Sequence, residues 1–210
     1  MSVEIKTGVN ERKLIFAINM TIDGCFDHTA MIADDELHDF YTSLLNNVDA
    51  VLFGRKTYQL MESFWPIAYE DSLATKSILA FADKINNIPK IVFSKTLDKV
   101  NWNNTTLIKG NIVEEVLKLK QQEASENGTE EEDLKYRPGI SIGSLSIASI
   151  FMKLNLIDEY WFVVHPVILG KGKRLFEGIP DPFDGNGRLN LKLISTETFK
   201  SGVVVLHYEK

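Results

Sequence analysis

The 210-residue sequence has almost no cysteine and no long apolar run. Cys25 is the only cysteine, which excludes a disulfide framework and a thiolate metal cluster. No stretch approaches the roughly 18 consecutive apolar residues that a membrane-spanning helix needs. Lys6, Glu11 and Arg12 interrupt the N-terminal segment before the apolar core of a signal peptide could form. These absences predict a cytoplasmic protein that folds without covalent cross-links.

The 29 acidic residues outnumber the 23 Lys and Arg residues, which gives a net charge of −6 and an isoelectric point of about 5.3. A nucleic-acid partner usually requires a basic face, so this balance argues against one. The sequence contains no GxGxxG fingerprint, no GxxxxGK[ST] loop, no GxSxG elbow and no zinc-deaminase signature. Its four histidines lack metal-ligand spacing, so no metal site is predicted. The 44% hydrophobic and 25% charged content is that of an ordinary globular protein of one domain.

The most informative stretch spans residues 140–176. An apolar run over 140–142 ends at Gly143, and Ser144 follows as an N-cap residue. Residues 145–154 are apolar almost all round, which predicts a buried helix that ends at Asn155. Residues 160–168 are typical of a strand covered on both faces. A strand that enters a helix through Gly-Ser offers free N–H groups to an anion, although from this stretch alone an ordinary crossover without a ligand is the simpler interpretation.

Strands and helices alternate along the remaining chain. We expect strands at 14–18, 50–53, 90–93 and 105–108, and helices at 37–45, 58–64, 72–85 and 113–119. Two closing antiparallel strands are expected at 189–195 and 203–207. The pattern predicts one α/β domain over 1–210, with a mostly parallel sheet, helices on both faces and a C-terminal antiparallel hairpin. Residues 1–12 are predicted to be a loose lead-in, 121–138 an acidic surface insertion, and 178–187 a Pro/Gly loop.

Three turns that follow predicted strands carry small, hydroxyl or basic residues: 54–57, 94–96 and 143–146. Ligands of open α/β sheets bind at the carboxyl ends of the strands, so we expect these turns to meet there. A pyrophosphate suits the helix N-termini after Gly54 and Gly143, with Thr57 and Ser146 as hydroxyl donors. Arg55 and Lys95 are placed to hold the second phosphate that distinguishes NADP from NAD. Simple helix capping is the alternative for each turn taken alone.

Six segments extend this pattern: 21–24 (TIDG), 51–58 (VLFGRKTY), 91–97 (IVFSKTL), 142–144 (IGS), 156–159 (LIDE) and 166–176 (PVILGKGKRLF). In these segments and their order, the chain resembles the dihydrofolate-reductase-like superfamily. Within it, the chain is most similar to the C-terminal reductase domain of bifunctional riboflavin-biosynthesis proteins. The resemblance covers roughly residues 14–208.

The resemblance implies an NADPH-binding reductase fold, usually a homodimer, that transfers hydride to a heterocyclic or imine-like substrate related to pterins or pyrimidines. By position, the residues that would cradle the cofactor phosphates are Gly54, Arg55 and Thr57. The adenosine 2′-phosphate would meet Ser94 and Lys95. The pyrophosphate and nicotinamide would lie against Gly143, Ser144, Leu145 and Ser146. The substrate cleft would be lined by Thr21, Asp23 and Gly24, and closed by the loop that contains Gly170 and Lys171.

The chain also departs from the family pattern. A single glycine precedes Ser144 where dihydrofolate reductases have paired glycines, and the acidic insertion has no counterpart. Asp34 and Asp35 start the helix that carries the pterin-binding acid in dihydrofolate reductases, but neither aligns with that role. The deaminase half of the bifunctional proteins is missing, which favours a stand-alone reductase of unknown substrate.

Asp23 is the candidate for orienting the substrate or relaying a proton, although an Asp-Gly pair also forms ordinary turns. Two other functions stay open. One is a catalytically silent, dimeric nucleotide-binding protein that keeps the fold. The other is an interaction protein that works through the acidic stretch over residues 121–135.

Overall fold

The computed structural model describes residues 11–121, 138–176 and 188–210. The predictions for the lead-in up to residue 10, for the acidic insertion over 122–137 and for the loop over 178–187 lie outside these residues. Arg12, at the end of the predicted lead-in, is buried, forms an ion pair with Asp49 and donates to the carbonyl of Leu119. None of the helices in the described ranges is long and apolar enough to cross a membrane.

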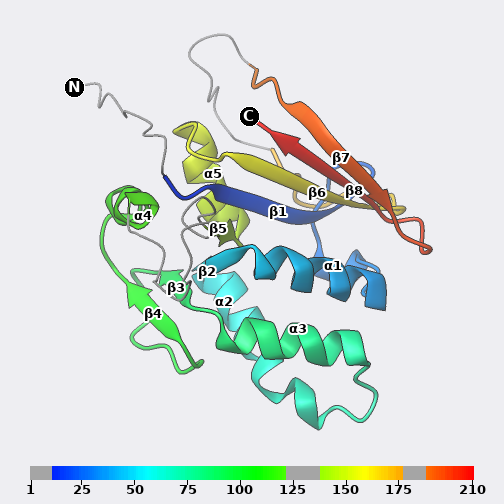
Figure 1. The fold of residues 1–210 in the computed structure, drawn as a ribbon, viewed down its shortest axis with the longest axis horizontal. Helices are drawn as coiled ribbons and strands as arrows, with labels where there is room; N and C mark the ends of the chain where they lie inside the picture. The colour runs from blue at the N-terminus through cyan, green and yellow to red at the C-terminus, as the bar shows by residue number, and fades with distance from the viewer. Residues whose placement is uncertain (1–10, 122–137, 177–187) are drawn as a thin grey trace, which may run out of the picture.

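Within the described ranges, the strands form one eight-stranded sheet, in the order β4-β3-β2-β5-β1-β6-β8-β7 (Figure 1). The strands are β1 (Leu14–Thr21), β2 (Val48–Gly54), β3 (Lys90–Phe93), β4 (Thr105–Ile108), β5 (Gly139–Ile142), β6 (Glu159–His165), β7 (Lys192–Thr198) and β8 (Val204–Glu209). Strands β1 to β6 pair in parallel, whereas β8 runs antiparallel to both β6 and β7. The predicted α/β fold with its C-terminal antiparallel hairpin is therefore confirmed.

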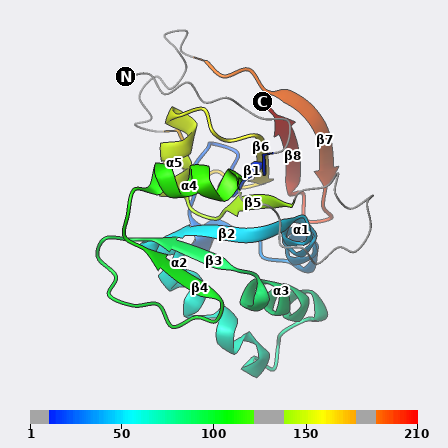
Figure 2. The same ribbon diagram turned by 60° about the vertical axis from the view of Figure 1, so that its left-hand side comes forward.

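Helices cover both faces of this sheet (Figure 2). They are α1 (Asp35–Asn46), α2 (Arg55–Glu62), α3 (Lys76–Asn87), α4 (Ile112–Gln121) and α5 (Leu145–Lys153), with short 3-10 segments η1 (His28–Ala30) and η2 (Trp65–Glu70). Successive strand side chains point to opposite faces. Phe16 therefore packs in one core cluster with residues of α4 and α5, while its neighbour Ile15 packs in the other with residues of α1, α2 and α3.

Several element ends differ from the prediction for local reasons. Helix α2 begins at Arg55, three residues early, because the extended backbone of Gly54 leads directly from strand to helix. Helix α3 begins at Lys76 because Thr75 caps it. Strand β6 ends at His165, before Pro166, which has no N–H to donate to a neighbouring strand. Asn155 has the left-handed conformation expected at the end of α5, with φ of 51°.

The buried Lys90 stabilises the C-terminal end of α3. Its Nζ donates to the carbonyl oxygens of Ile85, Asn86 and Ile88 at 2.9, 3.0 and 2.9 Å, and lies 4.6 Å from the centre of the Trp102 ring. Carbonyls at a helix C-terminus lack partners within the helix, so the ammonium group satisfies them. Burial lowers the pKa of Lys90 to about 8, which leaves the group charged at neutral pH.

We predict that Lys90→Met lowers the free energy of unfolding by about 2 kcal/mol, because buried carbonyl groups lose their hydrogen bonds. Urea unfolding at neutral pH measures the difference. Lys84→Met on the same helix is the matched control, and its effect is expected to stay within about 0.5 kcal/mol. Equal stability of the Lys90→Met variant and the wild type would contradict the capping role.

Candidate functional site

Five adjacent parallel strands bring the predicted site segments to one edge of the sheet. In the order β3, β2, β5, β1 and β6, these strands are followed by residues 94–96, 54–57, 143–146, 21–24 and 169–172. Parallel strands end on the same side, so every segment singled out from the sequence lies at the carboxyl edge. This edge is where open α/β sheets bind ligands.

The turns after β2 and β5 touch each other at Gly54. A Cβ atom at this position would lie only 2.9 Å from the Oγ atoms of both Ser144 and Ser146. At Gly143, a Cβ atom would lie 2.5 Å from the Phe53 ring. Both glycines are therefore needed for space, and their lack of a side chain lets the N-termini of α2 and α5 approach each other.

These two helix N-termini have no side-chain cap. Gly54 offers no side chain to α2, and Ser144, although it occupies the predicted N-cap position of α5, directs its Oγ to that of Ser146 at 3.1 Å. By contrast, Asp34 caps α1 and Thr75 caps α3 through the backbone N–H groups of the third helical residues. The N-termini of α2 and α5 thus present unsatisfied N–H donors and positive dipole ends, which suit an anion.

Basic side chains flank these N-termini. Arg55 is exposed on the first turn of α2, where Thr57 is partly buried, and Lys95 is exposed after β3. The Oγ of Ser94 accepts from the backbone N–H groups of Thr96 and Leu97 at 3.2 and 3.1 Å, which fixes the turn that carries Lys95. On α5, Leu145 is buried and Ser146 is exposed. This donor set fits a dinucleotide with more than one phosphate group.

On the other side of the edge, Asp23 is held by four hydrogen bonds, one of which its carboxylate accepts from Sγ of Cys25 at 3.8 Å. Its carboxylate accepts from the hydroxyl of Thr21 at 2.6 Å and from the backbone N–H groups of Gly170 at 2.8 Å and Leu169 at 3.3 Å. The Thr21 hydroxyl and then the Gly170 N–H lower the pKa of Asp23 to about 2. The group is therefore ionised at neutral pH, so it accepts hydrogen bonds and has no proton to donate.

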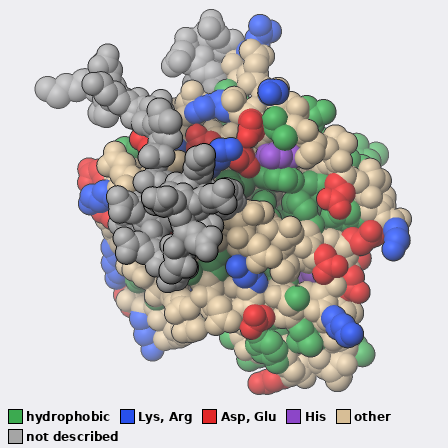
Figure 3. All heavy atoms as spheres, in the orientation of Figure 1, with side chains coloured by type: hydrophobic (Ala, Val, Ile, Leu, Met, Phe, Trp, Pro, Cys, Tyr) green, Lys and Arg blue, Asp and Glu red, His purple; other side chains and the backbone are tan. Residues whose placement is uncertain are grey.

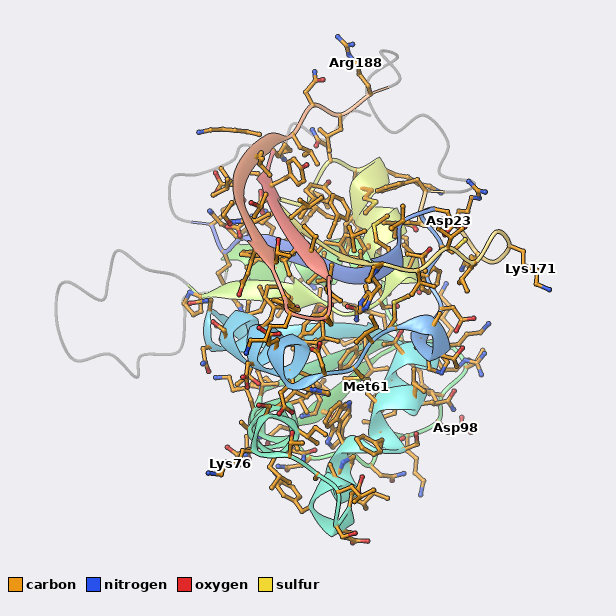
Figure 4. The ribbon with its side chains drawn as sticks, turned by 90° about the vertical axis from the view of Figure 1, so that its right-hand side faces the viewer. Asp23, Met61, Lys76, Asp98, Lys171 and Arg188 are labelled. Atoms are coloured by element: carbon orange, nitrogen blue, oxygen red, sulfur yellow. The ribbon has the colours of Figure 1, made fainter. Side chains whose placement is uncertain are left out.

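These bonds join two loops that the sequence places far apart. The backbone N–H of Phe26 donates to the carbonyl of Lys173, and that of Leu175 donates to the carbonyl of Gly24, each at 3.0 Å. Gly24 and Gly170 both have positive φ, at 78° and 70°, which favours glycine at these turns. Lys171 is exposed and projects to the outside of the molecule, as Figure 4 shows.

His165 belongs to the same edge and was not predicted as a site residue. Its imidazole is fully buried, with Nδ1 accepting from the backbone N–H of Ile32 at 3.0 Å and Nε2 donating to Oδ1 of Asn19 at 3.1 Å. Burial lowers the pKa of His165, against the opposing effect of the Asp34 charge, so the ring is neutral. In the sequence, His165 stands out only as part of a His-Pro pair, because Ile32 and Asn19, which form hydrogen bonds with its ring, are distant in the chain.

The two acidic residues at the start of α1 have structural contacts. Asp34 caps the helix by accepting from the N–H of Leu37 at 2.9 Å, and Asp35 accepts from the hydroxyl of Thr75. No contact of either carboxylate assigns it the pterin-binding role.

We predict that Asp23→Asn speeds amide hydrogen exchange at Leu169 and Gly170 at least about tenfold, because both N–H groups lose a charged acceptor. Exchange followed by NMR measures the effect. Asp27→Asn is the control, since Asp27 accepts from Thr29 in an exposed turn and leaves the loop alone. Unchanged exchange at both amides would show that other contacts hold the loop.

We also predict a pH effect from His165. Its folded-state pKa lies below the unfolded value of about 6.5, so the unfolded chain binds more protons as the pH falls. The stability that the protein gains from burying the neutral His165 ring is therefore fully present above about pH 6.5 and is lost as the pH falls below that value. Urea unfolding at about pH 7.5 and 5.5 should show a smaller loss for His165→Asn, which keeps an acceptor for Ile32, than for the wild type. Parallel losses would contradict the assignment.

Comparison with known proteins agrees with this geometry. The family model described as RibD C-terminal domain matches residues 12–205. Uncharacterized protein YyaP of Bacillus subtilis (strain 168) is 32% identical over 206 residues, covering 95% of this chain and 96% of its own.

Two solved structures share the fold. A putative riboflavin biosynthesis protein from Shewanella sp. PV-4 aligns with a TM-score of 0.62 at 19% identity, over 94% of this chain and 98% of its own. A diaminohydroxyphosphoribosylaminopyrimidine deaminase/5-amino-6-(5-phosphoribosylamino)uracil reductase from Thermotoga maritima aligns with a TM-score of 0.59 at 19% identity, over 95% of this chain and 56% of its own. With the family match over nearly the whole chain, these similarities give the conclusion: the chain belongs to the RibD C-terminal domain family and has its dihydrofolate-reductase-like fold.

Proposed function

We propose that the protein is an NADPH-dependent reductase that transfers a hydride to a small heterocyclic or imine-like substrate related to the pyrimidines. The observation that carries this proposal is the meeting of two uncapped helix N-termini at Gly54, on an edge that also bears Arg55 and Lys95. Membership of a family of reductase domains supports the same reaction class.

In this proposal the N–H groups at the starts of α2 and α5 bind the cofactor pyrophosphate, with Thr57 and Ser146 as added donors. Arg55, Ser94 and Lys95 bind the 2′-phosphate. NADPH, when bound, supplies the hydride. The nicotinamide end of the cofactor faces the turns after β5 and β1, so the substrate lies near Thr21 and Gly24. Because Asp23 is ionised, it orients a substrate N–H donor, and the proton that completes the reduction comes from water.

The loop that contains Gly170 and Lys171 is basic, which favours a substrate with an anionic group. Lys171, Lys173 and Arg174 are all exposed there, and the name of the Thermotoga maritima relative specifies a phosphoribosylamino uracil. We therefore propose a pyrimidine that carries a phosphate or carboxylate as the first substrate class to test.

A catalytically silent nucleotide-binding protein is the second candidate. The observation that favours it is that Asp23, the predicted catalytic residue, accepts hydrogen bonds from Thr21 and Gly170 and so has a structural role in holding a loop. Both candidates bind NADPH, so they differ in whether bound NADPH is consumed when a pyrimidine substrate is added.

Titration of NADPH and NADH into the purified protein tests the cofactor site. We expect tighter binding of NADPH, and Lys95→Ala should weaken NADPH about tenfold while leaving NADH unchanged, because one charged phosphate contact is lost. Gly54→Ala should weaken both nucleotides, since its Cβ separates the two helix N-termini. Gly110→Ala is the matched control, because only Ile108 lies near its Cβ, at 4.0 Å.

The outcomes separate the candidates. Failure of both nucleotides to bind the folded protein would contradict both proposals. Binding of NADPH without its oxidation across a panel of phosphorylated and carboxylated pyrimidines would favour the silent nucleotide-binding protein.

A further inference from the structure

A pocket lies at the amino ends of β3 and β4, away from the candidate site. Its volume is about 470 Å³, which is in the range of small-molecule sites. Its wall comes from the last turn of α2, from η2, from the end of α3 and from the turn before β4, and it includes four asparagines. The segments of the candidate site follow the carboxyl ends of their strands, so the pocket is a separate feature of the molecule.

The hydroxyl of Tyr58 holds two walls of this pocket together. It donates to Oε1 of Glu62 at 2.5 Å and accepts from the backbone N–H groups of Asn101 and Trp102 at 3.0 and 3.3 Å. Burial and then the hydrogen bond to Glu62 raise the pKa of Tyr58, so the hydroxyl keeps the proton that it donates. These bonds join the end of α2 to the turn before β4.

A second set of hydrogen bonds is centred on Asn86. Its Oδ1 accepts from the indole N–H of Trp102 at 2.6 Å, and its Nδ2 donates to the carbonyl of Trp65 at 2.9 Å. The end of α3 is thereby joined to η2 and to the turn before β4. The pocket is therefore framed by hydrogen bonds that the chain makes with itself.

Other polar groups of the pocket wall have no partner. Among the described residues, no group donates to Oε2 of Glu62, and the carboxamides of Asn101 and Asn103 form no hydrogen bond. A molecule in the pocket would therefore meet one carboxylate oxygen and two carboxamides that are free to bind it.

The carboxylate of Glu62 has no counter-ion within the described ranges. It belongs to the last turn of α2, which carries no basic side chain, and the C-terminus of a helix is the negative end of its dipole. At the end of α3, by contrast, Lys90 donates to three carbonyl oxygens. The negative charge at the end of α2 is therefore uncompensated by the chain, and the pocket favours a cation.

The η2 wall of the pocket is apolar. Pro66 and Tyr69 are exposed there, Tyr69 to 53%. In the space-filling view, hydrophobic side chains gather at the lower end, where Figure 1 draws the segment between α2 and α3 (Figure 3). Methylene groups pack well against such rings, while a charged group at their end reaches a carboxylate. The pocket therefore suits a ligand that is part aliphatic and part cationic.

We propose that this pocket binds a small molecule that carries a primary ammonium group on an aliphatic chain. An ammonium group has three N–H donors, which match Oε2 of Glu62 and the carboxamide oxygens of Asn101 and Asn103. Because Oε1 of Glu62 already accepts from Tyr58, a compact ammonium group fits this carboxylate better than the two-pronged guanidinium does. The proposal does not rest on the proposed reductase function.

The test is a titration of n-butylamine, which is protonated at neutral pH, into ¹⁵N-labelled protein in phosphate buffer at constant ionic strength. We expect saturable NMR shifts of the side-chain amides of Asn101 and Asn103 and of the indole N–H of Trp102, with a Kd of about 1 mM. The controls are n-butanol, which lacks the charge, and ammonium chloride, which lacks the chain. Each should bind at least about tenfold more weakly.

Three variants locate the binding. Glu62→Gln keeps an acceptor for Tyr58 but removes the charge, so it should weaken n-butylamine at least about tenfold. Glu70→Gln is the matched control, because it removes the same charge from η2 at a residue that does not line the pocket. Asn103→Asp adds a second carboxylate and should tighten binding several-fold, which keeps the proposal testable if Glu62→Gln fails to fold.

Several outcomes would overturn the proposal. They are the absence of a saturable shift at the pocket signals, an equal response to n-butanol or to ammonium chloride, and unchanged binding in both Glu62→Gln and Asn103→Asp. NADPH titration of the same samples reports on the proposed reductase separately, so failure of one proposal is distinguishable from failure of the other.

Discussion

The contact at Gly54 is the constraint on which the proposed cofactor site depends. Two helices that follow neighbouring strands begin there, and they come together only because no side chain separates the turns. Their N-terminal N–H groups stay unsatisfied, whereas α1 and α3 use Asp34 and Thr75 as caps. An uncapped helix N-terminus costs stability, and two of them at one point are what the proposed anion site requires.

The part of the edge proposed to bind the substrate differs, because its polar groups already have hydrogen-bond partners. Thr21, Asp23 and the backbone of Gly170 form a closed set of hydrogen bonds, and His165 fixes Asn19 and Ile32 nearby. The half of the carboxyl edge around Asp23 is therefore held in place by its own hydrogen bonds, while the half at the N-termini of α2 and α5 has free N–H donors. A dinucleotide would supply the missing acceptors and leave the rigid half to orient a second molecule.

Local sequence signals predicted the fold well. The bounds of β3 and β4 came out as predicted, since each strand is a short apolar or β-branched run between turns. The site segments could be placed because parallel strands end at one edge, which is a property of the fold rather than of any side chain. The sequence did not reveal the partners of Asp23 and His165, since a hydrogen bond to a distant backbone N–H leaves no local pattern. The start of α2 was also missed, because Gly54 was interpreted as a turn residue rather than as the junction between strand and helix.

The strand order carries a consequence for how the chain acquires its structure. Among the strands of the described residues, β1 pairs with β5 and β6, both of which come much later in the sequence. While the chain is being synthesised, β2, β3 and β4 can pair with one another, but β1 has no neighbour until residues beyond 139 are available. Contacts of such long sequence separation form slowly. The backbone of β1 therefore has no strand partner in the nascent chain until β5 is made, and an unpaired apolar strand is prone to misassociation during that time.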